Sequence, residues 1–139
     1  MKLPELKIGE KVATVPIVQG GMAIRLSTAR LAASVANEGG VGVISAANVG
    51  FNEPDFKTNT VNANLRALKS ELLKAREKAK TGIIGVNIMV ALTTFAEMVR
   101  TSIEAKADVI FSGAGLPMDL PKIFNETCER KKEEFKTKL

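Results

Sequence analysis

The sequence predicts an α/β fold built from about four parallel β/α units, because one pattern repeats along its 139 residues. In each repeat, a short apolar stretch rich in β-branched residues leads into a loop of small residues and then into a helical pattern. Strands that are apolar throughout are typical of a parallel sheet covered on both faces. Four such units are half of an eightfold TIM barrel, which typically needs about 250 residues. The chain is therefore either a smaller α/β domain or a partial barrel.

The expected strands and loops can be assigned to residue ranges, together with a segment before the first unit and one after the fourth. Residues 1–12 alternate apolar and charged positions around Gly9, which favours a short strand or hairpin covering the bottom of a barrel. After the fourth unit, residues 136–139 stand where a fifth strand would come next. No linker or low-complexity segment interrupts the chain. The expected strands are 15–18, 41–45, 83–89 and 108–112, and the loops that follow them are 19–22, 46–50, 90–93 and 113–117.

Periodic apolar positions predict helices between these strands. Ser27 is expected to be the N-cap of the first helix, and the glycines at 39–40 are expected to end it. The long helix over about 61–80 has an apolar stripe and a charged face, which includes Glu71 and is expected to face solvent. Residues 94–97 form a capping box for the third helix. The last helix begins shortly after the fourth loop.

The composition excludes several kinds of site. The chain has no histidine, so it supplies no Ser-His-Asp triad and no imidazole base, and no metal site is expected. The net charge of +5 comes from bases mixed with acids along helices, so nucleic-acid binding is not expected, whereas an attraction for acidic partners stays open. The single Cys128 rules out an internal disulfide, and no histidine is present to activate its thiol. Without a signal-peptide core or a run of about 18 apolar residues, a soluble cytoplasmic protein is expected.

The loops after the predicted strands hold the candidate functional residues, because ligands of α/β proteins bind at the carboxyl ends of strands. Gly20 and Gly21 either let a ligand lie against bare backbone or form a tight turn. Asn87 is polar inside an apolar strand and either ties down loop backbone or meets a ligand. Ser112 ends the fourth strand on the same side and either lines a pocket or caps the loop.

Other candidates are less specific. Met22 and Met89 suit core packing, and they also suit a flat aromatic ligand beside glycine loops. The chain contains neither the dinucleotide-binding glycine motif nor a P-loop. The carboxylates show no spacing that pairs them for catalysis, and Asp108, which opens its strand, is expected to contribute to stability.

The chain contains four segments in the order PIVQGGM, LAASVANEGGVGVISAANVG, GIIGVNIMV and IFSGAGLP. Together they resemble the start of the flavin-dependent nitronate monooxygenases, formerly called 2-nitropropane dioxygenases. The closely similar flavin-dependent enoyl-acyl-carrier-protein reductases share these segments. The resemblance covers nearly the whole chain, from about Leu6 to the fourth helix.

The resemblance implies a (β/α)8 barrel that holds FMN at its carboxyl-end face, with residues 1–139 as its N-terminal half. One loop would run along the flavin ring, and the third strand would line the same pocket. By similarity the cofactor-binding residues are Gly21, Met22, Ala23, Asn87 and Met89, and those near the substrate are Ser112 and Gly113.

The implied chemistry is oxidation of an alkyl nitronate with dioxygen, or NAD(P)H-dependent reduction of an enoyl thioester. Some nitronate-oxidising members have a catalytic histidine where the fourth strand ends. Ser112 stands there in this chain, so the catalytic residues are left unassigned. The family's phosphate-gripping glycine loops belong to the second half of the barrel. The chain alone is therefore expected to bind FMN weakly or not at all, unless another chain completes it.

Two further hypotheses stay open. The chain could be a truncated or split-gene domain without catalytic activity, because a half barrel leaves two sheet edges and an apolar interior uncovered. Such a domain is expected to form a homo-oligomer or to pair with a chain that supplies the second half. Alternatively, it could be a small α/β module that binds a phosphorylated ligand without redox chemistry. Yellow colour on purification separates the flavin hypotheses from this last one.

Overall fold

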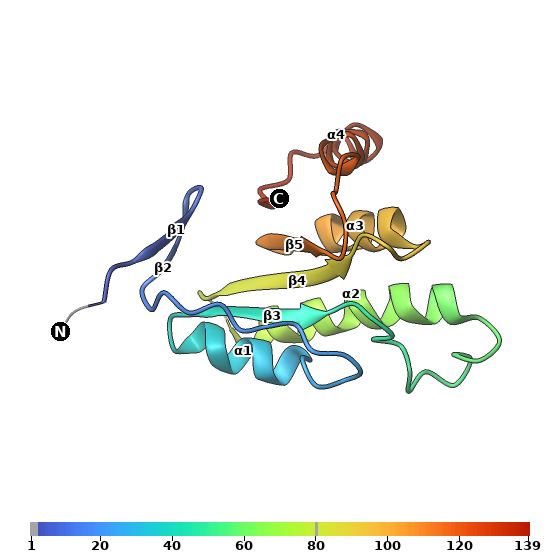
Figure 1. Ribbon diagram of the computed structural model, residues 1–139, viewed down its shortest axis with the longest axis horizontal. Coiled ribbons are helices and arrows are strands. Elements are labelled where there is room, and N and C mark those ends of the chain that lie inside the picture. The colour runs from blue at the N-terminus through green and yellow to red at the C-terminus, as the bar shows by residue number, and fades with distance from the viewer. Residues whose placement is uncertain (1–2, 80) are drawn as a thin grey trace.

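A computed structural model of the chain describes residues 3–79 and 81–139. It contains a three-stranded parallel sheet in the order of the sequence, made of β3 (Val41–Ser45), β4 (Ile83–Met89) and β5 (Val109–Gly113) (Figure 1). A helix separates each strand from the next, so the strands run parallel through crossover connections. The helices are α1 (Ala29–Asn37), α2 (Thr60–Lys78), α3 (Phe95–Glu104) and α4 (Leu120–Lys131).

The sheet register aligns the carboxyl ends of the strands. Ser45 of β3 lies opposite Asn87 of β4, and Asn87 lies opposite Phe111 of β5. The predicted strands 41–45 and 83–89 are confirmed. The strand predicted over 108–112 begins one residue later, after Asp108.

The strand predicted over 15–18 is wrong as a regular strand. A parallel bridge between Val18 and Val41 joins this segment to β3. The N–H of Val41 donates to the Ile17 carbonyl at 2.9 Å, and the N–H of Gln19 donates to the Val41 carbonyl at 3.0 Å. The chain then turns away from the sheet, so the pairing is too short to make a ladder.

Residues 136–139 lie where a fifth strand was expected. Lys138 forms a parallel bridge with Val109 of β5. The N–H of Lys138 donates to the Asp108 carbonyl, and the N–H of Ile110 donates to the Lys138 carbonyl, both at 2.8 Å. The C-terminal end therefore covers part of the outer edge of β5 (Figure 1).

A hairpin precedes the sheet, as expected. It consists of β1 (Leu6–Ile8) and β2 (Lys11–Ala13), which are antiparallel, and Gly9 in the turn has a φ of +60°. In Figure 1 the hairpin lies at the left, on the side from which the arrows of β3 and β4 start. Its apolar side chains pack with the first residues of the strands in a small cluster that includes Ala13, Val41, Ile83 and Val109.

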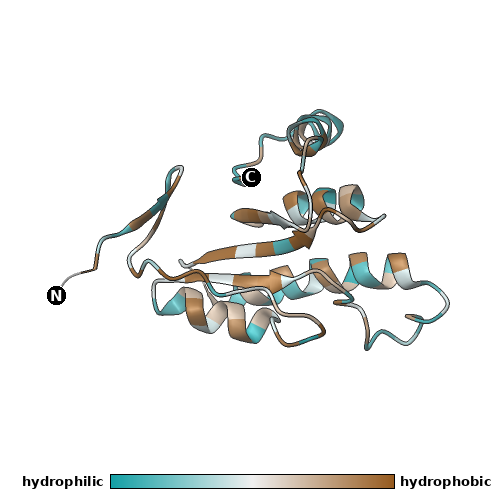
Figure 2. Ribbon diagram, in the orientation of Figure 1, coloured by the Kyte–Doolittle hydropathy of each residue, from teal (hydrophilic) through white to brown (hydrophobic). Residues whose placement is uncertain are grey.

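The two faces of the sheet differ in what covers them. Alternate strand residues, such as Ile44, Ile84 and Ile110, are buried in a large core against the helices. The other residues point to the opposite face, where the hairpin covers their amino ends. Figure 2 shows strands coloured mainly as hydrophobic and helices with mixed faces. Within the described ranges, no helix combines the length and apolarity needed to cross a lipid bilayer.

The start of α1 differs from the sequence prediction. Its N-cap is Thr28, not Ser27, whose hydroxyl is used elsewhere. Glu71 of α2 is buried rather than solvent-facing, and its Oε2 accepts the Ala29 N–H at 2.7 Å. A carboxylate satisfies a free donor of the first turn of a helix well, so the charge of Glu71 stabilises α1 from a neighbouring helix. Thr94 is the N-cap of α3 as predicted, but no side-chain cap hydrogen bond accompanies it in the described structure.

Gly42 of β3 should be intolerant of a side chain. A Cβ there would lie 1.8 Å from the Ala32 carbonyl oxygen of α1, which is backbone and has no room to move aside. We expect Gly42→Ala to lower the free energy of unfolding by about 3 kcal/mol or more, measured by urea denaturation. Gly113→Ala is the matched control, because Gly113 also lies in a strand but a Cβ there would meet nothing within 4 Å. Equal stability of the two variants would contradict the packing of α1 on β3.

Candidate functional site

A row of side chains crosses the sheet at its carboxyl end, on the face opposite the helices. Ser45, Asn87 and Phe111 share this face because they lie opposite one another in register. Met89 and Gly113 pair one layer further along. Asn87 is half-buried and Met89 is 40% exposed, so the row is accessible at its outer end.

The loop after the first segment packs directly onto this row. A Cβ on Gly21 would lie 2.6 Å from the Cβ of Asn87, so this contact requires glycine. A Cβ on Gly20 would meet nothing within 4 Å, and Met22 is 53% exposed. The structure therefore brings Gly21 beside Asn87 and leaves the space next to the Cα of Gly20 empty.

Ser27 holds this loop from its far end. Its Oγ accepts the Met22 N–H at 2.8 Å and donates to the Gly20 carbonyl at 3.1 Å. The side-chain amide of Gln19 donates to the same Oγ at 2.8 Å. Sequence reasoning assigned Ser27 to a helix cap and gave Gln19 no role. The available signal was a pair of polar residues bracketing a glycine-containing loop.

The carboxamide of Asn87 has capacity left for a ligand. Its Nδ2 donates to the Phe111 carbonyl at 3.5 Å, the outer limit of a hydrogen bond. A carboxamide offers both donors and an acceptor, so it can pair with the polar edge of a ring. Together with exposed thioethers and open glycine backbone, it forms a surface suited to a flat ligand with a polar rim.

The structure does not bring Ser112 to this surface. Ser112 lies opposite Ile88 and two residues after Ile110, and both isoleucines face the helices. Its hydroxyl oxygen is buried and has no hydrogen-bond partner among the described residues. Gly113, the next residue, lies on the same face as Met89, and the space where its side chain would be is empty.

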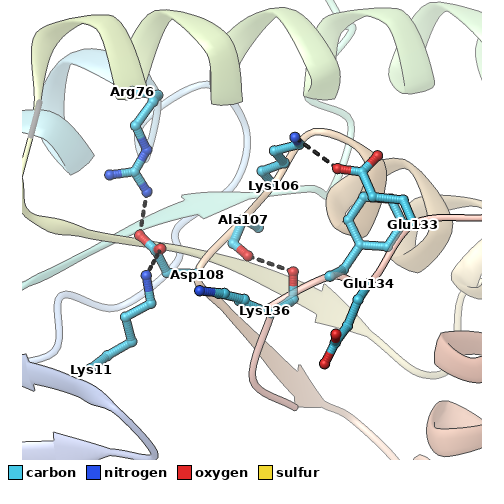
Figure 3. Close-up of a pocket in the computed structure, with 10 residues that line it drawn as sticks. Lys11, Arg76, Lys106, Ala107, Asp108, Glu133, Glu134 and Lys136 are labelled. Atoms are coloured by element: carbon cyan, nitrogen blue, oxygen red, sulfur yellow. Dashed lines mark hydrogen bonds and ion pairs between the residues drawn. The ribbon is translucent and has the colours of Figure 1, made fainter. Parts of the chain in front are cut away.

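A cavity of about 450 Å³ lies at the opposite end of the sheet. It is lined by the hairpin, the start of β5 and the C-terminal segment, and Figure 3 shows Lys11 and Arg76 converging on Asp108 within it. Lys106 pairs with Glu133 at 2.9 Å. Most of the charges that line the cavity pair with one another, so we assign it to the structural framework rather than to ligand binding.

Asp108 joins three parts of the fold. Its carboxylate accepts the Lys11 ammonium at 2.6 Å, the Ile84 N–H at 2.9 Å and the Arg76 guanidinium. Burial opposes ionisation of this group, but the Ile84 N–H and the two cations outweigh it and hold the pKa of Asp108 below its usual value. The expectation that Asp108 stabilises the amino end agrees with this geometry.

The family model described as nitronate monooxygenase matches residues 6–128. FabK from Thermotoga maritima is similar at 29% identity and a TM-score of 0.60, and the match covers 81% of this chain and 31% of that chain. A methionine-to-alanine mutant of the same FabK matches at 31% identity and a TM-score of 0.60, over 81% of this chain and 33% of that one. A search of curated proteins found no match.

The chain thus spans about a third of the length of these solved structures. The predicted fold class, parallel β/α units that make up part of a TIM barrel, is confirmed by the match. The prediction that ligand-facing loops follow the strands stays a prediction at the level of individual residues.

Gly21→Ala should disturb the contact between the loop and β4. The new methyl group would overlap the Cβ of Asn87, so either the loop or the strand must shift. We expect a loss of about 1–3 kcal/mol in the free energy of unfolding and a changed NMR signal for the Asn87 side-chain amide. Gly20→Ala, one residue away in open space, should stay within about 0.5 kcal/mol of the wild type. A silent Gly21→Ala variant would show that the loop does not pack on Asn87.

Asp108→Asn should lower stability at neutral pH and less so in acid. A group whose pKa is lowered in the folded state contributes stability above its unfolded pKa, and this contribution is lost as the pH falls below about 4. We expect a loss of about 1–3 kcal/mol at pH near 7, and a smaller gap between variant and wild type at pH near 3, by urea denaturation. Asp55→Asn is the control, because Asp55 also has a lowered pKa, held down by Arg66, but lies at the surface. A gap that does not depend on pH would rule out the proposed charge effect.

Proposed function

Given that the chain belongs to the nitronate monooxygenase family, we propose that it forms the N-terminal portion of an FMN-dependent oxidoreductase. The observation that carries this proposal is the close packing of Gly21 on Asn87 at the carboxyl end of the sheet. FMN, when bound, supplies the redox chemistry, and the protein positions and tunes it. The site residues are then binding groups rather than acids or bases.

The residues present fit the ring of FMN. The flavin ring is flat, with a hydrogen-bonding edge, and the Asn87 carboxamide can donate to and accept from such an edge. Met22 and Met89 are exposed and polarisable, and they suit contact with an aromatic face. Gly21, Met22 and Ala23 would run along the ring, with Asn87 and Met89 beside it.

The same residues do not fit the phosphate of FMN. Residues 20–23, Asn87 and Met89 include no cation. Arg25, the nearest in sequence, donates to the Val49 carbonyl at 3.1 Å and lies 3.9 Å from the carboxylate of Glu71. We therefore propose that β/α units outside these residues hold the phosphate. They would come from a second copy or from a chain that supplies the second half of the barrel.

The proposed reaction is oxidation of an alkyl nitronate with dioxygen. The alternative is NAD(P)H-dependent reduction of an enoyl thioester. The absence of an imidazole base favours this alternative. The chain has no histidine, and Ser112, at the place of the histidine in some nitronate-oxidising members, faces the helices. No imidazole base is therefore available from these residues to take a proton from a nitroalkane.

The first test is the absorbance spectrum of the purified protein, taken with its intact mass and after addition of FMN. Bound FMN in the full chain alone would support the proposal and show that this portion makes a usable site. FMN bound only after the remaining part of a family barrel, such as that of FabK, is supplied would support it as well. No flavin in either preparation would overturn it.

Asn87→Ala should weaken FMN binding in whichever preparation binds it. Loss of the carboxamide removes the group proposed to meet the ring edge, and we expect an increase of about tenfold in the dissociation constant. The measurement is a flavin fluorescence titration. Asn62→Ala is the matched control, because Asn62 is exposed on α2 and its amide bonds only to the nearby Asn59 in the described structure. Equal affinity of both variants would remove Asn87 from the site.

A further inference from the structure

We propose that Gln19 and Ser27 act as a positioning pair for the flavin-facing loop, an inference that rests on the proposed function. The pair brackets residues 20–26, which include the three residues proposed to run along the ring. Neither residue would touch the cofactor. Their role is to fix the distance between the loop backbone and Asn87, so that the flavin ring binds in one defined position.

The first argument is the density of hydrogen bonds at a buried point. Ser27 is 2% exposed, and its hydroxyl connects the Gln19 amide, the Gly20 carbonyl and the Met22 N–H. The backbone adds a further bond, from the Ser27 N–H to the Met22 carbonyl at 3.0 Å. Two positions of the loop, Gly20 and Met22, are therefore tied together with Gln19 to one side chain.

The second argument is that both members are also tied to β3. The Val43 N–H donates to the Oε1 of Gln19 at 3.0 Å, and the Ser45 N–H donates to the Ser27 carbonyl at 3.0 Å. Ser45 lies directly opposite Asn87 in the sheet. The Gln19–Ser27 pair thus fixes the loop to β3, the strand next to Asn87, rather than only to other residues of the loop.

The third argument is that the loop exposes large apolar side chains to solvent. Met22, Ile24 and Leu26 are all about half exposed or more. Large apolar side chains held in solvent do not fold a loop by burial, so polar anchors must hold it. Beyond the pair, the loop is fixed by its contact with Asn87 and by the bond from Arg25 to the Val49 carbonyl.

The test compares Ser27→Ala with Ser34→Ala in the FMN-binding preparation of the full chain. Ser34 is an exposed serine of α1 whose hydroxyl bonds to the Arg30 carbonyl, so its variant controls for the chemical change. We expect Ser27→Ala to weaken FMN binding about tenfold, because the Met22 N–H and the Gln19 amide lose their acceptor and the loop is released. Amide hydrogen exchange at Met22 should also speed up in the ligand-free protein, and the absorption band of bound flavin should change shape. Ser34→Ala should match the wild type in all three measurements.

Gln19→Ala and the double variant test whether the two residues act as a unit. If they do, the double variant should bind FMN about as weakly as either single variant, because either change alone breaks the hydrogen bonds that link the pair to the loop. A Ser27→Ala variant that melts at a lower temperature but keeps wild-type affinity and flavin spectrum would reduce Ser27 to a structural residue and overturn the inference. A wild-type protein that binds no FMN in any preparation would instead overturn the proposed function, and the inference with it.

Discussion

The backbone donors along the outer edge of β3 must all find acceptors, and this requirement shapes the carboxyl end of the molecule. The Val41 N–H is satisfied by the Ile17 carbonyl, as in an ordinary parallel ladder. Beyond that point a side chain and a returning loop replace the neighbouring strand, through the Oε1 of Gln19 and the carbonyl of Ser27. An unpaired buried N–H costs about as much as a lost hydrogen bond, so this substitution is necessary once the chain leaves the sheet. The chain can therefore leave the sheet early and place glycine backbone beside Asn87.

The two ends of the sheet carry different chemistry. At the amino end, Asp108 draws together a lysine of the hairpin, an arginine of α2 and a backbone N–H of β4. Its charge is fully committed to holding the fold. At the carboxyl end, the accessible groups are an amide, two thioethers and glycine backbone, all neutral. This division agrees with barrels in general, where the lower face serves stability and the upper face serves ligands.

Sequence periodicity predicted the elements whose partners are local or uniformly apolar. Strands 41–45 and 83–89 were predicted correctly because every position except Asn87 is small or apolar, and a short run of this kind, rich in β-branched residues, is typical of a buried parallel strand. The errors came from residues whose role depends on a distant partner. Glu71 belongs to a charged helical run, and only the fold shows that it reaches the start of α1. Ser27 is a residue type that commonly caps helices, but its hydroxyl instead accepts hydrogen bonds from Gln19 and Met22, eight and five residues earlier.

The candidate site was predictable only in part, for a similar reason. Asn87 could be identified as a candidate because it is polar inside an apolar strand. Its contact with Gly21 could not be predicted in the same way, because the two residues lie far apart in the chain. The direction of Ser112 was accessible from the sequence, because strand residues alternate and Ile110 was clearly a core position. Its assignment to the substrate side rested on resemblance and did not apply that alternation.

Under the proposed function, a neutral site limits what these residues would contribute to flavin chemistry. Its residues can hold a ring and pair with its edge, but they have no group that changes charge near neutral pH. Charge-assisted bonds to a phosphate are roughly twice as strong as neutral bonds, so most of the affinity for FMN would come from the units that hold the phosphate. The contribution of this portion would then be orientation rather than affinity. Orientation requires a rigid surface, and the hydrogen bonds that tie the glycine loop to β3 give the loop that rigidity without adding a charge.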